Sequence, residues 1–215
     1  MCIRDRIYDQ VVLISRQAKE FFNRPLTNIV FMGMGEPLMN YNNVLKSIAK
    51  ITSKSGLAMS PKRIVVSTSG VPKMIKKMAD DKVKFKLAVS LHSAVNETRT
   101  SIMPFNKKMN LDELAEAMQY WYTKTKNIIT YEYVVWKGIN DKKEDINALI
   151  KFCKKAPSKV NLIQYNSIDD PNFVQASKII LEDYIRLLTS NKIKATIRRS
   201  RGQDIDAACG QLANK

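Results

Sequence analysis

The sequence predicts an α/β fold in which helices cover a parallel sheet. Short apolar stretches rich in β-branched residues alternate with amphipathic stretches at intervals of roughly 20 to 45 residues, which is typical of strand–helix–strand units. Strands are expected over residues 28–32, 63–67, 84–90, 128–136, 160–163 and 195–197. They could form an open doubly wound sheet or part of a β/α barrel, and in either case ligands bind at the carboxyl ends of the strands.

Apolar residues that recur every three or four positions predict the helices. They are expected over residues 43–51, after Val71, from Asn110 onward, over residues 146–153, and over about residues 176–188. Asn110 can cap its helix, with Glu113 three residues further on. Cys153 continues an apolar stripe that Pro157 stops, and we therefore expect this cysteine in the core.

Length and composition exclude several classes of protein. A chain of 215 residues is long enough to bury a core without disulfides or metal ions. Its apolar runs are too short to span a bilayer, and its first residues lack the apolar segment of a signal peptide. Its cysteines, Cys2, Cys153 and Cys209, are far apart and odd in number, which rules out a disulfide framework and a paired-cysteine zinc site. We expect a reduced, cytoplasmic protein without a metal site of its own.

The net charge of +16 is spread along the chain and favours a polyanionic partner. A lysine-rich surface that is merely solvated is the alternative. The densest basic cluster covers residues 192–201, and its arginines are suited to phosphate oxygens because the guanidinium forks onto them. Arg198, Arg199 and Arg201 are our candidates for contacts with nucleic-acid phosphates.

Polar residues follow four of the predicted strands. The strings are Gly33-Met34-Gly35-Glu36-Pro37, Ser67-Thr68-Ser69-Gly70, Ser90-Leu91-His92-Ser93 and Gln164-Tyr165-Asn166-Ser167. Because the carboxyl ends of parallel strands meet at one edge, these groups should converge on a ligand that bears ammonium, carboxylate and ribose groups. Each string alone has a structural alternative: a turn with a helix-starting glutamate, a helix cap, or a hydrogen-bonded histidine.

Cys209 lies between Ala208 and Gly210, away from any apolar stripe. A packing role is therefore not expected. An accessible thiol is a candidate nucleophile, and an exposed cysteine without a role is the alternative.

Together these strings, with Arg201-Gly202-Gln203-Asp204-Ile205-Asp206-Ala207-Ala208-Cys209-Gly210-Gln211-Leu212, resemble the RlmN/Cfr family of radical S-adenosylmethionine RNA methyltransferases. The resemblance begins near Ile7 and covers nearly the whole chain. It is stronger to the RlmN branch, which methylates carbon 2 of adenine in 23S rRNA and tRNA. Methylation of carbon 8, as in the Cfr branch, stays open.

The resemblance implies a radical mechanism. One S-adenosylmethionine would methylate Cys209, and a second would be cleaved at a [4Fe-4S] cluster to a radical that abstracts hydrogen from the S-methyl group. The electron would come from a donor such as flavodoxin. By matching positions, the residues that hold S-adenosylmethionine would be Gly35, Glu36, Ser67, Ser90, Leu91, His92 and Asn166. Arg198, Arg199 and Arg201 would then contact RNA.

The chain departs from the family at its beginning. The family's Cys-x-x-x-Cys-x-x-Cys cluster loop, resolving cysteine, catalytic glutamate and amino-terminal RNA-binding domain should precede Gly35, and only Cys2 is found there. We therefore interpret residues 1–6 as a foreign or truncated start and residues 7–201 as an incomplete barrel without its first strand and cluster loop. Residues 202–215 form the segment with the methyl-accepting cysteine. This chain alone is expected to bind no cluster and to be inactive and monomeric.

Two other functions fit parts of the pattern. The strand-end loops could shape a non-catalytic RNA-binding module. Alternatively, the chain could be a metabolic barrel enzyme that acts on an anionic small molecule.

Overall fold

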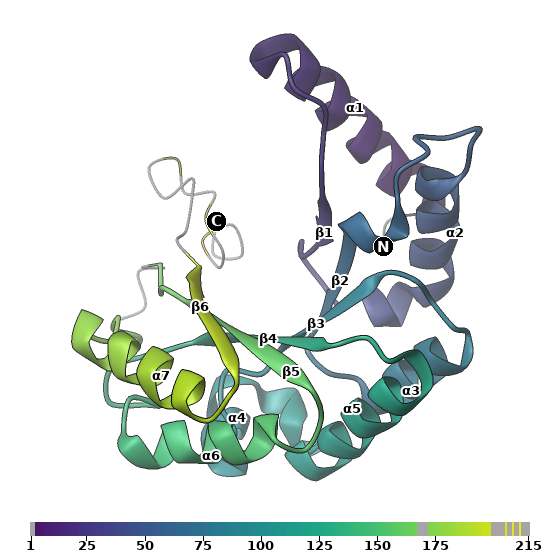
Figure 1. The fold of residues 1–215 in the computed structure, drawn as a ribbon. Coiled ribbons are helices and arrows are strands. Elements are labelled where there is room, and N and C mark those ends of the chain that lie inside the picture. The colour runs from purple at the N-terminus through teal and green to yellow at the C-terminus, as the bar shows by residue number, and fades with distance from the viewer. Residues whose placement is uncertain (1–2, 167–171, 199–204, 206–207, 209–210, 212–215) are drawn as a thin grey trace.

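A computed structural model describes residues 3–166, 172–198, 205, 208 and 211. Within this part of the chain, six strands alternate with helices (Figure 1). The strands are β1 (Ile29–Phe31), β2 (Ile64–Thr68), β3 (Lys86–Ser90), β4 (Ile129–Val134), β5 (Ser158–Ile163) and β6 (Lys194–Arg198). The α-helices are α1 (Arg4–Phe22), α2 (Tyr41–Thr52), α3 (Pro72–Asp80), α4 (Asn96–Ile102), α5 (Leu111–Thr125), α6 (Lys143–Cys153) and α7 (Lys178–Ser190).

All strand pairs are parallel, and the strand order is β1-β2-β3-β4-β5-β6. A doubly wound sheet reverses its strand order at a switch point, whereas a barrel keeps the order of the chain. Among the described residues no pairing joins β6 back to β1, so the sheet is a partial barrel. This decides between the two architectures that the sequence left open.

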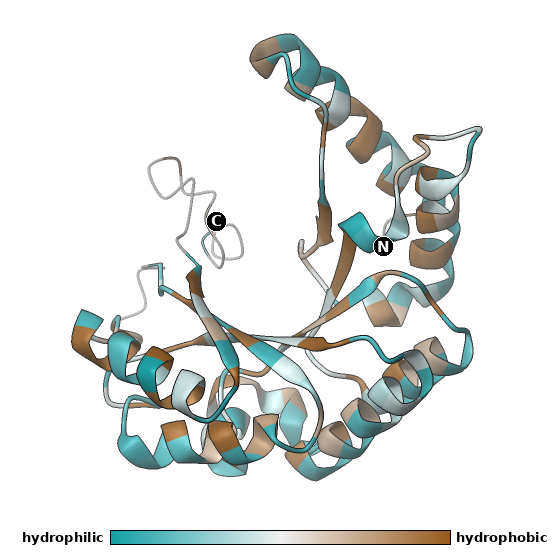
Figure 2. Ribbon diagram, in the orientation of Figure 1, coloured by the Kyte–Doolittle hydropathy of each residue, from teal (hydrophilic) through white to brown (hydrophobic). Residues whose placement is uncertain are grey.

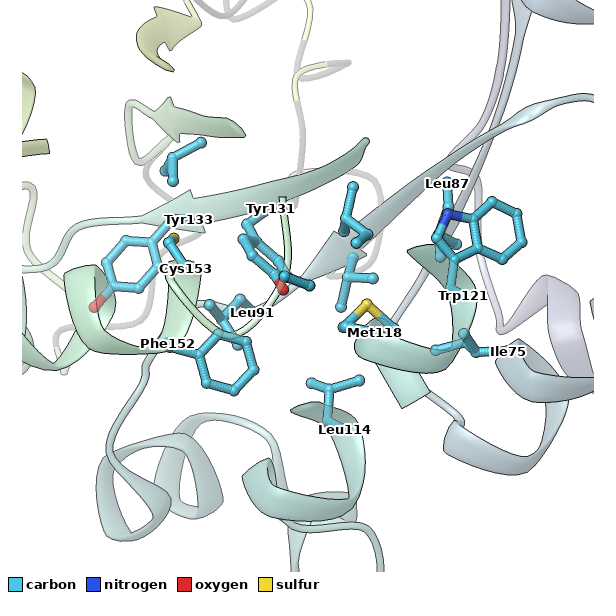
Figure 3. Close-up of a cluster of buried hydrophobic side chains, with 14 of the residues drawn as sticks. Ile75, Leu87, Leu91, Leu114, Met118, Trp121, Tyr131, Tyr133, Phe152 and Cys153 are labelled. Atoms are coloured by element: carbon cyan, nitrogen blue, oxygen red, sulfur yellow. The ribbon is translucent and has the colours of Figure 1, made fainter. Parts of the chain in front are cut away.

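The core lies between the sheet and the helices on its outer side (Figures 1 and 3). Leu114, Met118 and Trp121 of α5 are fully buried there, together with Leu87 and Tyr131 of the sheet. The helices carry polar residues on their other sides (Figure 2). Because strand side chains alternate, the neighbours of the core residues face the inner side of the sheet, which no helix of the described residues covers.

Several expectations about individual elements are confirmed. Asn110 caps α5, since its Oδ1 accepts the backbone N–H groups of Asp112 and Glu113 at 3.0 Å each. Cys153 is 4% exposed and belongs to the core. Burial raises the pKa of its thiol to about 12.

Two helices were not expected from the sequence. Helix α1 begins at Arg4, within the segment interpreted as a foreign start. Helix α4 follows β3, and a 3-10 helix, η3 (Pro104–Lys107), separates it from α5. The apolar stripe of α4 is too short for its period to be recognised. None of the helices in the described ranges has the length and hydropathy required to cross a bilayer.

Arg99 of α4 joins the loops that follow β2 and β3. It is 0% exposed. Its Nη2 donates to the carbonyl oxygens of Ser69 and Ser90 at 2.7 and 3.4 Å, and its Nε donates to that of Leu91 at 3.1 Å. Burial lowers the pKa of Arg99 to about 10, so the guanidinium remains charged at neutral pH. Within the described residues, hydrogen-bond acceptors rather than a paired carboxylate surround this charge.

Replacing Arg99 should therefore destabilise the fold strongly. In Arg99→Met several buried carbonyl oxygens lose their donor, and we expect the free energy of unfolding in urea to fall by about 3 kcal/mol or more. Arg186→Met is the control, because Arg186 is an exposed residue of α7 paired with Asp183; it should cost less than about 0.5 kcal/mol. A loss below about 1 kcal/mol for Arg99→Met would contradict the role given to Arg99.

Candidate functional site

A cleft of about 1010 Å³ lies at the carboxyl ends of β1, β2 and β3. It is lined by the turn after β1, the ends of β2 and β3, and parts of α1 and α2. Five residues predicted to bind a ligand line it, namely Gly35, Glu36, Ser67, Ser90 and His92. The convergence expected from the sequence is therefore present for the first three strands.

The turn after β1 leaves room beside its backbone. Gly35 has a φ of +87°, a conformation that residues with a Cβ rarely adopt. A Cβ at Gly33 or at Gly35 would meet no protein atom within 4 Å. Both glycines therefore border open space, and a ligand can approach the main chain of the turn closely.

Glu36 ties this turn to the loop after β2. Its Oε1 accepts the Leu38 N–H at 2.9 Å, which starts the 3-10 helix η1 (Pro37–Asn40). Its Oε2 accepts the backbone N–H of Ser69 at 2.8 Å and the Ser69 hydroxyl at 2.7 Å. The carboxylate thus fixes the shape of the cleft wall and also brings a negative charge to it. Glu36 was expected at the ligand site, whereas its hydrogen bonds to Ser69 were not.

The hydroxyl-bearing residues Ser67 and Ser90 lie near the ends of neighbouring strands. Residues of β2 and β3 alternate between core and inner side, and Val66, Leu87 and Val89 belong to the core. Ser67 and Ser90 therefore face the inner side of the sheet. They line the cleft and can donate or accept hydrogen bonds there.

His92 has a φ of +56° and is held from two sides. Its Nδ1 accepts the Val134 N–H at 3.2 Å, and its carbonyl oxygen accepts Nδ2 of Asn140 at 2.7 Å. Burial, aided by the charge of Arg99, lowers the pKa of His92 to about 4. The ring is thus neutral at physiological pH, and because Nδ1 is an acceptor the proton resides on Nε2.

Leu91 and Asn166, which were also predicted to bind the ligand, are not among the residues that line the cleft. The Leu91 side chain is fully buried in the core. The Leu91 N–H donates to the Glu132 carbonyl oxygen at 3.0 Å, and the Leu91 carbonyl oxygen accepts Nε of Arg99. Asn166, after β5, is 3% exposed and does not line the cleft.

Arg198 contacts the inner side of the barrel. Its Nη1 lies 3.8 Å from Oε2 of Glu132 and 3.4 Å from the sulfur of Met32, in the turn after β1. Glu132 is buried and receives a hydrogen bond from Nδ2 of Asn161 at 2.9 Å. Its burial raises the pKa of the carboxyl. Arg199, Arg201 and Cys209 lie outside the described residues.

Sequence reasoning missed three residues of this region: Ser69, Arg99 and Glu132. Ser69 was inside a recognised string, but its link to Glu36 spans 33 positions. Arg99 reads as a surface residue of a polar helix, and Glu132 as an ordinary residue of an apolar strand. Only the alternation of β4, which turns Tyr131 and Tyr133 into the core, could have placed Glu132 on the inner side.

The sequence of this chain matches a known superfamily and several named proteins. The sequence profile of the Radical SAM superfamily matches residues 4–153. A Flavobacterium psychrophilum protein named "Probable dual-specificity RNA methyltransferase RlmN" is 71% identical over 209 residues, which cover 97% of this chain and 60% of that protein. A protein of the same name from Cytophaga hutchinsonii is 52% identical over 97% of this chain and 57% of its own length. The chain thus spans less than two thirds of these relatives.

Solved structures show the same fold. The crystal structure of a radical SAM methyltransferase from Sphaerobacter thermophilus matches with a TM-score of 0.94 and 36% identity, over 98% of this chain and 61% of that one. Streptococcus suis SuiB, solved with S-adenosylmethionine, matches with a TM-score of 0.62 at 14% identity, over 99% of this chain and 45% of that one, which supports the fold alone. Because the superfamily profile covers most of the chain, from α1 to the end of α6, this protein belongs to the radical SAM superfamily.

Proposed function

We propose that this chain is the carboxy-terminal part of a radical SAM enzyme that methylates carbon 2 of adenine in 23S rRNA and tRNA, with Cys209 as the methyl acceptor of the first step. The observation that carries the proposal is the convergence of Gly35, Glu36, Ser67 and His92 on one cleft. The high identity to proteins named as dual-specificity RNA methyltransferases supports the substrate class. The net charge of +16 agrees with an RNA partner.

The cleft fits S-adenosylmethionine. Its volume of about 1010 Å³ is at the upper end of small-molecule sites. The open backbone beside Gly33 and Gly35 can receive the amino-acid end of the ligand. Ser67, Ser90 and Nε2 of His92 offer hydrogen bonds to its ribose and carboxylate. When bound, S-adenosylmethionine supplies an activated methyl group and a 5′-carbon for radical chemistry.

The cysteines of this chain do not fit a [4Fe-4S] cluster. Cys153 is buried on the helix side of the sheet, and its thiol pKa is raised, so it cannot act as a thiolate ligand at the cleft. Cys2 and Cys209 are the other two cysteines, fewer than the three ligands that such a loop provides. We therefore propose that this chain alone holds no cluster and has no turnover. Residues upstream in a longer protein would supply the ligands.

The remaining partners follow from the same proposal. A longer protein with a cluster needs an electron donor such as flavodoxin. It would act as a monomer in the cytoplasm. Within the cleft, this chain's own contribution is to bind the ligand and to hold its amino end.

Glu36→Gln should weaken the binding of S-adenosylmethionine to this chain. An amide has one acceptor atom, so it cannot receive both the Leu38 and the Ser69 donors. We expect equilibrium dialysis to give an affinity about tenfold lower, which corresponds to one lost charge-assisted hydrogen bond. Glu20→Gln, an exposed change in α1, is the control and should leave the affinity unaltered. Equal affinities for the two variants would argue against Glu36 as part of the site.

His92 should make the stability depend on pH in acid. Its folded pKa of about 4 lies below its ordinary value of 6.5, so between these values the unfolded chain binds a proton that the folded chain does not. The free energy of unfolding should therefore be about 2 kcal/mol lower at pH 5 than at pH 7. Part of this pH dependence should disappear in His92→Asn, because asparagine does not titrate. Asparagine is chosen since it tolerates the positive φ of this position. His92 is the sole histidine, so an NMR titration of the ring measures its pKa directly; a value above 6 would refute the neutral ring.

The activity itself is tested in a longer protein that includes the upstream cysteine loop. We expect Cys209→Ala to abolish 2-methyladenosine in RNA, as measured by mass spectrometry of nucleosides, and to change RNA affinity less than about twofold. Cys153→Ala is the matched control, because Cys153 belongs to the core. Continued methylation in Cys209→Ala would rule out the proposed acceptor. A product with 8-methyladenosine would assign the Cfr branch instead.

A further inference from the structure

Three lysines occupy the same unusual backbone position. Lys82, Lys126 and Lys192 have φ values of +50°, +56° and +61°. They follow α3, α5 and α7 and precede β3, β4 and β6, so all three lie at the amino ends of strands. This edge of the sheet is opposite to the cleft, which lies at the carboxyl ends.

Chain geometry does not require lysine at these positions. The left-handed conformation costs a residue with a Cβ about 1 kcal/mol, and glycine or asparagine is the usual choice. Each lysine N–H already closes its turn, for example from Lys126 to the Tyr122 carbonyl oxygen at 2.9 Å. The helix dipoles do not explain the choice at Lys82 and Lys126, because Lys77 and Lys124 already place a cation in the last turns of α3 and α5. Helix α7 has no basic residue in its last turn, so Lys192 also suits the dipole of that helix.

A second row of lysines lies beside the first. Lys86, Lys159 and Lys194 stand near the amino ends of β3, β5 and β6. The core residues Leu87, Val160 and Ile193 are their neighbours along the chain, so these lysines face the inner side of the sheet. Lys159 and Lys194 are direct partners in the register of β5 and β6. Two positive charges at directly paired positions repel each other, so this pair of lysines does not stabilise the sheet.

None of these six lysines takes part in an ion pair within the described residues, although the charge of Lys159 acts on the buried carboxyl of Glu132 and lowers its pKa against the larger upward effect of burial. Nearby acids have other partners. Asp81 accepts hydrogen bonds from Tyr41 and Lys77, and Asp80 accepts one from Tyr120. Within the described residues, the positive charge at this edge is therefore not paired with carboxylates at ion-pair distance.

We propose that Lys82, Lys86, Lys126, Lys159, Lys192 and Lys194 form a docking surface for the phosphate backbone of RNA. Four adjacent strands at about 4.8 Å spacing make the surface roughly 15 Å wide, enough for several phosphates. Strands of five or six residues separate it by roughly 17–20 Å from the cleft. The surface therefore holds RNA away from the reacting nucleotide and adds affinity without reading its sequence. This inference rests on the proposed RNA substrate.

The three lysines with positive φ, Lys82, Lys126 and Lys192, allow a test in which RNA binding and stability change in opposite directions. The variant Lys82→Gly/Lys126→Gly/Lys192→Gly removes three charges and relieves the strained φ values. Its unfolding midpoint should stay the same or rise. Its affinity for a fluorescein-labelled RNA stem-loop, measured by anisotropy, should fall by about two orders of magnitude at about 0.1 M salt, with a log–log salt slope reduced by about 2 to 3.

Lys46→Gln/Lys143→Gln/Lys151→Gln is the matched control, since it removes the same charge from exposed positions of α2 and α6. Its salt slope should fall by less than about 1. Equal losses in the two triple variants, or an unchanged salt slope in the glycine variant, would overturn the docking surface while RNA binding by the unaltered chain still supports the proposed function. If the unaltered chain does not bind RNA at all, the docking surface is refuted, whereas the RNA substrate is tested separately by methylation in the longer protein.

Discussion

The cleft depends on a hydrogen-bonded link centred on Ser69. The backbone and hydroxyl of Ser69 donate to Glu36, and its carbonyl oxygen accepts Nη2 of Arg99. Arg99 also holds the carbonyl oxygens of Ser90 and Leu91. Loops after three consecutive strands are thereby joined between a carboxylate and a buried guanidinium. Without this link, the loops after β1 and β2 would lose their connection to each other and to the loop after β3, and polar groups around the cleft would not keep a common geometry.

The link also explains the division of roles at the cleft. Glu36 and the main chain of Leu91 carry hydrogen bonds within the protein, which makes them part of the wall. Gly33 and Gly35 provide open space, and the Ser67 and Ser90 side chains face it from neighbouring strands. A neutral His92 adds a donor without adding charge. Few of the groups facing the cleft are charged, so the wall offers hydrogen bonds rather than ion pairs to a ligand.

The two ends of the sheet differ in their chemistry. The carboxyl ends carry the cleft, with hydroxyls and an imidazole, whereas the amino ends carry six lysines that form no ion pair within the described residues. Arg198 belongs neither to the groups that line the cleft nor to the lysines at the amino ends, since its guanidinium contacts Glu132 and Met32 on the inner side. The proposed RNA methylation would use both properties, a site for chemistry on one nucleotide and a charged surface for the rest of the polymer.

Local sequence patterns were enough to predict the parallel α/β class, the six strands to within a few residues, the cap at Asn110 and the burial of Cys153. These features repeat with the period of a helix or strand, so neighbouring residues along the chain reveal them. Tertiary structure alone decided the barrel order, the burial of Arg99, the partnership of Glu36 with Ser69 and the placement of Glu132. Such contacts join residues that are distant in sequence, and they arise from strand register and loop packing, for which no local period exists.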